Sequence, residues 1–230
     1  MQIEQLFESL RGGMIISCQA PTRSPLNDPH IISAMALTAE QQGAVGVRLN
    51  GHLNIAAARA RISAPIIGIE KVITADSDVY ITPMFAVAAR IAASGADIIA
   101  LDATQRARPN GERLEALLAR IQVELSLPVM ADISTFDEGV SAADCGAEII
   151  ATTLCGYTQN SAGTSLPAFS LLEQLAANLR VPIICEGGIS TPEDVRRAFD
   201  CGAFAVVVGT AITGITQLVR KFVTATPRGQ

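Results

Sequence analysis

The sequence contains no tryptophan, only two tyrosines and only seven phenylalanines among its 230 residues. So few aromatic side chains argue against a surface that stacks the bases of single-stranded nucleic acid. The chain also lacks an excess of basic residues, because its formal net charge at pH 7 is −5. Binding to nucleic acid or to an anionic membrane requires a positively charged surface, so we expect neither as a partner.

Signals for secretion, membrane insertion and disulfide formation are missing as well. The amino-terminal segment carries acids at Glu4 and Glu8, where a signal peptide would carry bases followed by an apolar run. The longest apolar stretch, residues 201–219, is interrupted by glycine, threonine and glutamine, so it predicts a strand, a turn and a helix rather than a membrane span. Five cysteines without a C-x-x-C pair favour free thiols in a reducing compartment. We therefore expect a cytoplasmic protein.

What the sequence does contain is a weak internal repeat of short apolar runs, each long enough for one strand. Four of the runs follow a Gly-Ala pair, three begin at a proline, and one lies near the amino terminus. The runs cover residues 14–17, 45–47, 65–69, 98–101, 128–131, 149–151, 182–185 and 204–208. Their continuous apolarity predicts strands that are covered on both faces, as in a parallel sheet.

The segments between these runs have the pattern of helices. Residues 29–42 and 114–118 place apolar side chains three and four positions apart. Thr135 and Thr191 each stand where the N-cap of a helix is expected, with an acid three residues later. The glycine of each Gly-Ala pair then stands where a helix is expected to stop.

Eight strands that alternate with helices predict one α/β domain, residues 1–230, folded as a single (β/α)8 barrel of the TIM type. Residues 3–10 are expected to form a short amino-terminal helix ahead of the barrel. The competing fold is a doubly wound open sheet, which ordinarily carries a G-x-G-x-x-G turn after its first strand. Here the first run leads into Ser17-Cys18-Gln19-Ala20-Pro21, so the barrel is favoured.

In such a barrel the chemistry takes place at the carboxyl ends of the strands. A polar residue or a glycine follows the apolar runs with unusual regularity, whereas packing alone predicts polar residues only somewhere in each loop. These residues are Gln19, Arg48, Lys71, Asp102, Asp132, Thr152, Thr153, Glu186 and Gly209. We expect most of them to face a common substrate site and two or three to serve as caps or as partners of buried backbone groups.

Lys71 is the most informative of these residues. Of the 17 basic residues only Lys71 and Lys221 are lysines. Arginine cannot lose its proton in a protein, whereas a lysine in an apolar site can have its pKa lowered and act as a base or as an amine nucleophile. The alternative is a lysine that merely extends along the barrel rim. Because Lys71 shares a strand face with Ile69, Glu70 is expected to point the other way, toward a neighbouring helix.

Glu186 is the second candidate for proton transfer. Lys71 ends the third predicted strand and Glu186 ends the seventh, so the two lie on opposite sides of the barrel mouth. A small substrate between them would meet one proton-transfer group on each face. An epimerase or racemase needs this arrangement, because inversion requires removal of a proton from one side and delivery from the other. The alternative is a carboxylate whose hydrogen bonds go to loop amides.

Two glycine turns after the last two predicted strands indicate a phosphate site. Gly187 and Gly188 follow one strand, while Gly209 and Thr210 follow the other. Glycines let backbone N–H groups approach an anion, and the positive end of a following helix adds to the attraction. We therefore expect a phosphorylated small-molecule substrate.

The remaining strand-end side chains suit a polar ligand. Gln19, Arg48 and Asp132 can bind a hydroxyl-rich molecule through amide and charge-assisted hydrogen bonds, although each could instead pair within the rim. His30 and His52 do not cluster with acids or thiols at the spacing of metal ligands, so we expect no metal site.

These strand-end segments resemble the N-acetylmannosamine-6-phosphate 2-epimerases over nearly the whole chain. The matching segments include residues 17–19, 46–48, 65–71, 80–83, 95–102, 130–132, 151–158, 185–187 and 208–212. The resemblance implies a cofactor-free barrel that interconverts N-acetylmannosamine 6-phosphate and N-acetylglucosamine 6-phosphate in sialic-acid and amino-sugar breakdown.

The resemblance also implies roles for individual residues. Lys71 and Glu186 would be the catalytic proton-transfer pair. The sugar contacts would be Gln19, Arg48, Asp132 and Thr153, and the phosphate contacts would be Gly187, Gly188, Gly209 and Thr210. Relatives commonly have a basic residue at the position of Gly188, so Arg106 is a candidate for a substitute phosphate contact. They commonly have an apolar residue at the position of Glu70.

Two other functions stay open at this point. Lys71 could form a Schiff base with a carbonyl substrate, as in an aldolase. The barrel could also be catalytically silent, binding a phosphorylated metabolite in order to regulate a partner. The apolar helix expected around residues 212–223 indicates either self-association as a homodimer or ordinary packing against the barrel.

Overall fold

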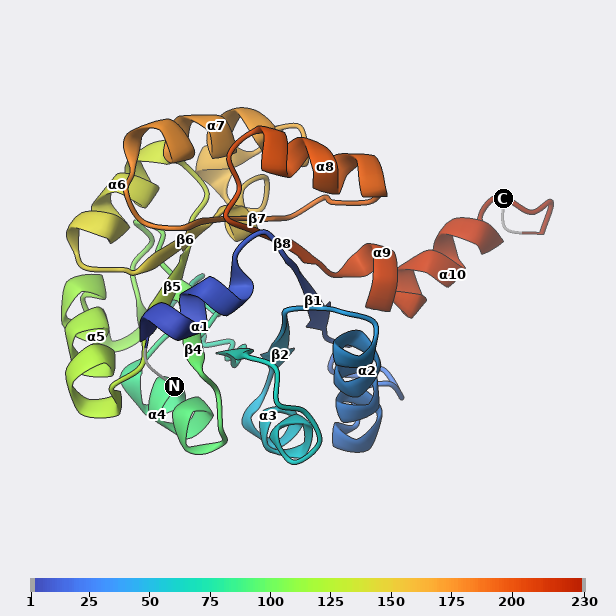
Figure 1. The fold of residues 1–230 in the computed structure, drawn as a ribbon, viewed down its shortest axis with the longest axis horizontal. Helices are drawn as coiled ribbons and strands as arrows, with labels where there is room; N and C mark the ends of the chain where they lie inside the picture. The colour runs from blue at the N-terminus through green and yellow to red at the C-terminus, as the bar shows by residue number, and fades with distance from the viewer. Residues whose placement is uncertain (1–2, 229–230) are drawn as a thin grey trace.

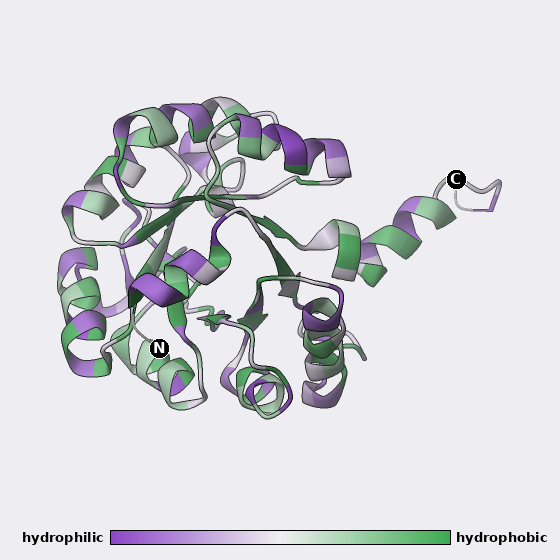
Figure 2. Ribbon diagram, in the orientation of Figure 1, coloured by the Kyte–Doolittle hydropathy of each residue, from purple (hydrophilic) through white to green (hydrophobic). Residues whose placement is uncertain are grey.

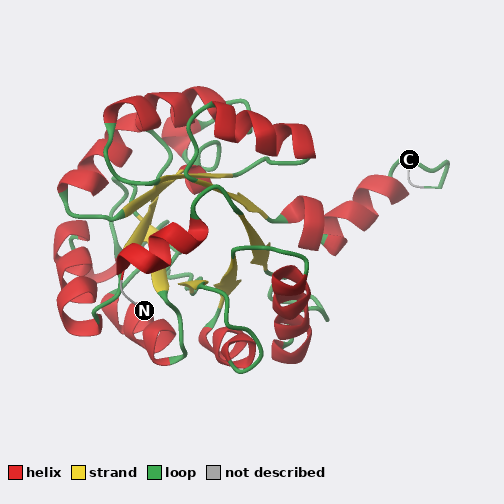
Figure 3. Ribbon diagram, in the orientation of Figure 1, coloured by secondary structure: helices red, strands yellow, loops and turns green. Residues whose placement is uncertain are grey.

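The computed structural model of the chain describes residues 3–228. Its centre is a closed barrel of eight parallel strands, in which each strand pairs with the next along the chain and the last pairs with the first. Figure 3 shows these strands surrounded by a ring of helices. The predicted (β/α)8 barrel is therefore confirmed, and the sheet is not the open one that competed with it.

Each predicted apolar run overlaps one strand of the barrel. The strands are β1 (Met14–Cys18), β2 (Gly46–Asn50), β3 (Ile66–Ile69), β4 (Ile98–Asp102), β5 (Val129–Asp132), β6 (Ile149–Ala151), β7 (Ile183–Glu186) and β8 (Ala205–Val208). The helices are α1 (Ile3–Leu10), α2 (Pro29–Gln41), α3 (His52–Arg59), α4 (Phe85–Ala93), α5 (Leu114–Arg120), α6 (Phe136–Asp144), α7 (Phe169–Asn178), α8 (Pro192–Asp200), α9 (Thr210–Thr213) and α10 (Ile215–Val223).

The helix boundaries follow from local hydrogen bonding. The Thr135 side chain accepts a hydrogen bond from the backbone N–H of Glu138, whose carboxylate in turn accepts from the Thr135 backbone, so the predicted capping box begins α6. Thr191 and Asp194 form the same motif at the start of α8. Gly43 follows α2 with a φ of +91°, a left-handed conformation that glycine adopts without a Cβ clash.

The apolar residues form two layers, one inside the barrel and one between the strands and the helices. Side chains on alternate strand positions fill the interior, and Leu6 and Leu10 of α1 extend this cluster. Figure 2 shows the strands as strongly hydrophobic and the helices as a mixture of hydrophobic and hydrophilic residues. With one end of the interior filled by apolar groups, polar side chains are left to gather at the carboxyl ends of the strands.

The carboxyl-terminal helices depart from the ring. Figure 1 shows α9 and α10 extending away from the barrel, and α10 has no buried residue. Its apolar side chains Val219 and Phe222 are 55% and 73% exposed. The expectation that this helix packs against its own barrel is therefore wrong for α10. Among residues 3–228, no helix combines the length and the apolarity that crossing a membrane requires.

Candidate active site

Strand alternation brings the predicted residues to one end of the barrel interior. Residues two positions apart on a strand face the same side. Asp132 therefore continues the interior face of Met130 on β5, and Glu186 continues that of Ile184 on β7. Lys71 lies two residues beyond the interior residue Ile69, just after the end of β3.

A buried network of charges occupies the centre of this end. The guanidinium of Arg48, on β2, donates two hydrogen bonds to the Asp132 carboxylate, from Nη1 at 3.0 Å and from Nη2 at 2.5 Å. Nη1 also donates to Oε2 of Glu186 at 2.5 Å. The side chains of Arg48, Asp132 and Glu186 are 1%, 0% and 14% exposed, so this cation is enclosed by two acids from the far side of the barrel.

The charge network shifts the pKa values of its members. Burial by itself lowers the pKa of Arg48, but the two carboxylates outweigh it and raise that pKa above its ordinary value. Burial raises the pKa of Glu186, with a smaller opposing effect from Arg48 and a reinforcing effect from Asp132. Glu186 thus holds a proton at higher pH than an ordinary glutamate does, which suits a group that both gives and takes protons.

Two threonines that follow β6 hold the acids in place. The Thr153 hydroxyl lies 2.6 Å from Oδ1 of Asp132 and 3.3 Å from Oε2 of Glu186. The Thr152 hydroxyl lies 2.9 Å from the carbonyl oxygen of Glu186 and accepts a hydrogen bond from its N–H at 3.0 Å. The predicted residue Thr153 therefore contacts the carboxylates themselves, while Thr152 fixes the backbone that carries Glu186.

Lys71 is held at both its backbone and its ammonium. Its backbone N–H donates to Oδ1 of Asn50 at 2.9 Å, and its Nζ donates to Oε1 of Gln19 at 3.0 Å. The Gln19 amide in turn donates from Nε2 to the Ser17 hydroxyl at 2.8 Å. Lys71 also pairs with Ile81 in an antiparallel bridge, so the loop after β3 doubles back beside the strand end. These contacts fix where the amine points.

The electrostatic environment lowers the pKa of Lys71. Part of the Lys71 side chain is exposed to water. The surrounding barrel rim nevertheless removes water from around its amine, and this desolvation is the largest cause of the lowered pKa. The positive charge of Arg48 lowers it further, and the carboxylates of Glu186 and Asp132 partly oppose that effect. Lys71 therefore shares one electrostatic environment with the predicted acid across the mouth, and it is more readily deprotonated than an exposed lysine.

Glu70 points away from the site, as the strand alternation predicts. Its carboxylate accepts a hydrogen bond from Nη2 of Arg90 in α4 at 2.8 Å and lies 3.1 Å from Nδ1 of His52 in α3. Burial alone would raise the pKa of Glu70, but the hydrogen bonds from Arg90 and His52 outweigh it, so the net shift is downward. The expected pairing of Glu70 with a neighbouring helix is confirmed.

The glycine turns lie side by side, because β7 pairs with β8. Gly187 and Gly188 have φ values of +107° and +76°, and a Cβ on Gly188 would lie only 2.5 Å from the Leu166 Cβ. A larger side chain at position 188 therefore has no room in this arrangement. Gly209 precedes Thr210, the first residue of the short helix α9.

Arg106, the candidate for a substitute phosphate contact, pairs with an acid at the end of another strand. Its Nη2 donates to Oδ2 of Asp102 at 2.5 Å, and its Nε donates to the Thr104 hydroxyl at 3.0 Å. Asp102 ends β4, which is opposite β8 in the closed barrel. The pairing neutralises a buried acid and occupies the guanidinium.

Two residues of this end escaped the sequence analysis as members of the site. Ser17 accepts a hydrogen bond from Gln19, and Asn50 accepts one from the backbone of Lys71. Each is two positions from a predicted site residue, Gln19 or Arg48. The alternation of strand side chains was the signal that could have found them. In residues 3–228 no group of three or more His, Cys, Asp or Glu side chains has the proximity that holding a metal ion requires.

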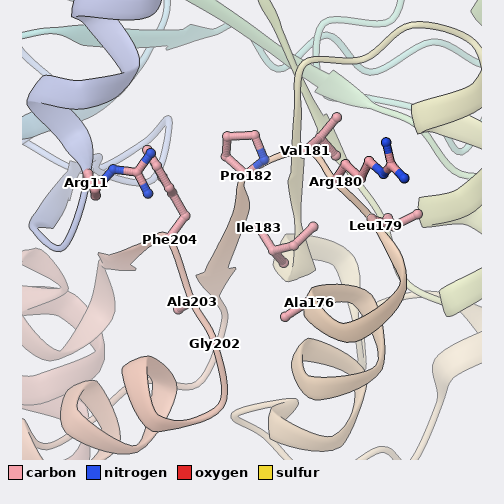
Figure 4. A pocket seen from close by; sticks show the side chains of 10 residues that line it. All are labelled: Arg11, Ala176, Leu179, Arg180, Val181, Pro182, Ile183, Gly202, Ala203 and Phe204. Atoms are coloured by element: carbon pink, nitrogen blue, oxygen red, sulfur yellow. The ribbon is translucent and has the colours of Figure 1, made fainter.

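A separate hollow of about 380 Å³ lies at the amino-terminal ends of β7 and β8 (Figure 4). Arg11 and Arg180 are the only titratable side chains among the residues that line it. Figure 4 shows Arg11 beside Phe204, and the Arg11 guanidinium lies 4.7 Å from the centre of that ring. This hollow is at the opposite end of the barrel from Lys71 and Glu186, and it offers no acid or nucleophile.

The closed barrel, with charged and amide side chains gathered at the carboxyl ends of its strands, defines the class of (β/α)8-barrel proteins with a polar site at that end. Comparisons with known proteins identify the family within this class. Residues 32–228 match the family model described as "Putative N-acetylmannosamine-6-phosphate epimerase". The chain belongs to this family.

Individual relatives agree with the family match. The chain is 50% identical over 227 residues to the putative N-acetylmannosamine-6-phosphate 2-epimerase of Synechococcus elongatus, with 98% of each chain covered. It is 42% identical to the similarly named protein of Cutibacterium acnes, over 95% of this chain and 96% of the relative. The solved structure of the N-acetylmannosamine-6-phosphate 2-epimerase from Clostridium perfringens superposes with a TM-score of 0.93 at 38% identity, covering 98% of both chains.

A more distant structure shows the fold alone. The thiamine phosphate pyrophosphorylase of Pyrococcus furiosus superposes with a TM-score of 0.61 at 14% identity, covering 91% of this chain and 90% of that one. At that identity only the barrel architecture is shared, so the comparison carries no information about substrate or chemistry.

Proposed function

We propose that the protein is a cofactor-independent epimerase that interconverts N-acetylmannosamine 6-phosphate and N-acetylglucosamine 6-phosphate. Membership of the epimerase family supports this substrate pair. The observation that carries the mechanism is the placement of Lys71 just after β3 and of Glu186 at the end of β7, two strands that lie four positions apart in a ring of eight. One proton-transfer group on each face of the bound sugar is what inversion at a single carbon requires.

The chemistry follows from the acidity of the C2 hydrogen in the open-chain sugar. The adjacent C1 aldehyde withdraws electrons, so removal of the C2 proton leaves the electron pair in an enolate whose charge lies largely on the C1 oxygen. One of the pair Lys71 and Glu186 accepts that proton, and the other delivers a proton to C2 from the opposite face. Arg48, which carries a fixed positive charge within the site, stabilises the enolate oxygen.

The other predicted residues are assigned to binding. Gln19, Arg48, Asp132 and Thr153 would hold the sugar oxygens, and Gly187, Gly188, Gly209 and Thr210 would hold the phosphate. Two adjacent glycine turns support the phosphate assignment, because their backbone N–H groups can approach an anion closely. Binding at one edge of the mouth would leave C1 and C2 of the sugar to extend toward Lys71.

Incubation of the protein with either sugar phosphate in D₂O, followed by NMR, tests this function. Epimerisation through an enolate replaces the C2 hydrogen with deuterium, so the C2 proton signal disappears as the second epimer forms. Retention of that hydrogen during turnover would exclude deprotonation and reprotonation. Trapping of a carbonyl substrate on Lys71 by borohydride would instead support an aldolase, and binding without exchange would support a sensor.

We also propose that two copies of the chain associate through α10. Five large apolar side chains of the carboxyl-terminal segment are exposed: Ile212, Ile215, Val219, Phe222 and Val223. The helix projects from the barrel in Figure 1, so its apolar face is accessible to a second copy, and symmetric dimers are the commonest soluble oligomers.

Sedimentation of wild type and of the Phe222→Glu variant tests the association. We expect wild type to sediment as a dimer and the variant as a monomer, because a charge on this face opposes burial. Val123→Glu is the matched control, since Val123 is 80% exposed on another part of the surface. A monomeric wild type would contradict the proposal.

We place the reaction in the cytoplasm, in the breakdown of amino sugars such as sialic acid. The five cysteines are free thiols, and free thiols are typical of a reducing compartment. Cell fractionation with an antibody to the protein would test the location, and growth on sialic acid after gene deletion would test the pathway.

A further inference from the structure

Ser17 lies between the phosphate turn proposed above and the tether of the catalytic amine. A Cβ placed on Gly209 would be 3.3 Å from the Ser17 Cβ and 3.6 Å from its Oγ, so the hydroxyl is next to the backbone of this turn. On its other side the same hydroxyl accepts a hydrogen bond from Nε2 of Gln19 at 2.8 Å. The Gln19 oxygen then accepts from Nζ of Lys71 at 3.0 Å.

The position of Ser17 itself is fixed. Its side chain is buried, with the residue 7% exposed, and its backbone pairs with Arg48 in the barrel. Its carbonyl oxygen accepts a hydrogen bond from the Thr213 hydroxyl at 2.7 Å, which connects β1 to the helix that follows the Gly209 turn. The Ser17 hydroxyl therefore stays at the junction between the turn and Gln19.

The orientation of the Gln19 amide decides whether neutral Lys71 can act as a base. With the amide oxygen toward Lys71, the neutral amine donates one N–H to that oxygen and its lone pair stays free. With the NH₂ group toward Lys71, the amide donates to the lone pair and blocks it. An ammonium has no lone pair and enforces the first orientation, but a neutral amine accepts either.

The Ser17 hydroxyl decides between these orientations through its own hydrogen. A hydroxyl can accept from the Gln19 NH₂ or donate to the Gln19 oxygen, so a free Ser17 permits both orientations. When its hydrogen is donated to an anion at the Gly209 turn, only the acceptor role remains. The Gln19 NH₂ is then held toward Ser17, and the amide oxygen is held toward Lys71.

We propose that Ser17 is a positioning residue that couples an anion bound at the Gly209 turn to the orientation of Gln19, and thereby keeps the Lys71 lone pair available to the substrate. This inference rests on the proposed epimerase function. The substrate phosphate, several bonds from the reacting carbon, would thus help to prepare the base as well as anchor the sugar.

The coupling is tested by supplying the sugar and the anion as two separate molecules. The dephosphorylated sugar N-acetylmannosamine is incubated in D₂O with and without inorganic phosphite, and C2 exchange is followed by NMR. In wild type we expect phosphite to accelerate exchange about tenfold or more, the equivalent of one hydrogen bond to a charged group. In Ser17→Ala the acceleration disappears, while phosphite still competes with the sugar phosphate for the site.

Three further variants distinguish positioning from structural damage. Ser17→Thr keeps the hydroxyl and should show the same acceleration as wild type. Gln19→Leu removes the amide that lies between Ser17 and Lys71 and should abolish the acceleration. Ser33→Ala removes a serine of similar burial in α2 and should respond to phosphite like wild type. The quantity compared is the ratio of the exchange rates with and without phosphite. A structural defect would lower both rates equally and leave this ratio unchanged.

Equal acceleration by phosphite in Ser17→Ala and wild type would overturn the coupling, as would its absence in wild type. Exchange at C2 of the intact sugar phosphate by wild type is measured in the same series. If that exchange is absent, the proposed epimerase function fails and the coupling fails with it. If it is present while Ser17→Ala behaves as wild type, only the coupling is wrong.

Discussion

Lys71 and Glu186 lie across the barrel mouth from each other, and each is held by a different partner. Gln19 binds the Lys71 ammonium at 3.0 Å, whereas Arg48 binds the Glu186 carboxylate at 2.5 Å. The pKa of Lys71 is lowered and that of Glu186 is raised, in both cases chiefly by burial. The two groups are therefore closer in proton affinity than an exposed lysine and glutamate, which favours proton exchange through a shared substrate.

The first prediction concerns pH. The pair works with one shared proton, so activity is lost when both groups are protonated and when both are deprotonated. Because burial raises the pKa of Glu186 above 4.5 and lowers that of Lys71 below 10.5, we expect a bell-shaped kcat/KM profile whose limbs lie inside those values. Gln19→Glu places a carboxylate against the Lys71 ammonium and should move the basic limb upward. A profile that is flat from pH 4 to 11 would contradict the assignment.

The second prediction concerns Lys71→Met, which removes the amine but keeps an unbranched side chain. We expect turnover to fall by about 10²–10⁴, the range of general acid–base catalysis. The folded-state pKa of Lys71 lies below the unfolded value, so the unfolded chain binds more protons and wild-type stability rises with pH.

The Met variant should therefore be more stable than wild type at neutral pH, and this advantage should fade as pH approaches 10.5. Urea unfolding monitored by circular dichroism at several pH values measures the difference. Lys221→Met, in the exposed helix α10, is the matched control and should change neither turnover nor this pH dependence. Near-normal turnover in Lys71→Met would remove Lys71 from the mechanism.

The third prediction concerns the buried cation. Arg48→Met leaves the carboxylates of Asp132 and Glu186 without their partner, so we expect a loss of about 3–5 kcal/mol in the free energy of unfolding at neutral pH. The loss should shrink at acidic pH, where protonation neutralises the abandoned acids. Denaturant unfolding at pH 5 and pH 8 checks both parts. Arg196→Met breaks an ion pair that is 70% exposed on the arginine side and should leave stability close to wild type.

The fourth prediction concerns Gly188, in the turn that follows β7. A Cβ there would lie 2.5 Å from the Leu166 Cβ and 3.1 Å from backbone atoms, at a φ of +76°. We expect Gly188→Ala to destabilise the protein by about 1–2 kcal/mol for the left-handed conformation and by about 1–3 kcal/mol more for the clash.

Gly12→Ala separates the two effects. Gly12 has a φ of +69°, and a Cβ placed on it would have no neighbouring atom within 4 Å, so only the conformational cost of about 1–2 kcal/mol applies. Thermal unfolding of both variants gives the comparison. Equal destabilisation would show that the loop around Leu166 yields to a side chain at position 188.

Much of the fold could be predicted because its signals are local and repeated. Unbroken apolar runs of strand length indicated β1 to β8, and the cap sequences at Thr135 and Thr191 indicated where α6 and α8 begin. The outward direction of Glu70 also followed from strand alternation alone. Such features depend on a residue and its neighbours in sequence, so no knowledge of distant contacts was needed.

The partners of the site residues could not be predicted in the same way. Arg48 and Glu186 are 138 positions apart, and nothing in either segment indicates that one side chain reaches the other. Likewise, the sequence suggested Arg106 as a phosphate contact and did not indicate that its guanidinium pairs with Asp102. Distances across a barrel mouth depend on how all eight strands close, which no single segment encodes.

The sequence by itself determined which residue types lie along each strand: an apolar interior, a polar residue or a glycine at the end of each strand, and one of only two lysines after the third strand. These are consequences of periodicity and side-chain chemistry. Only the tertiary structure decided which charges neutralise one another, which way Lys71 is tethered, and that α10 stands clear of the barrel. Those outcomes depend on barrel closure and burial, because a carboxylate or an amine acquires its pKa from groups that are close in space and far apart along the chain.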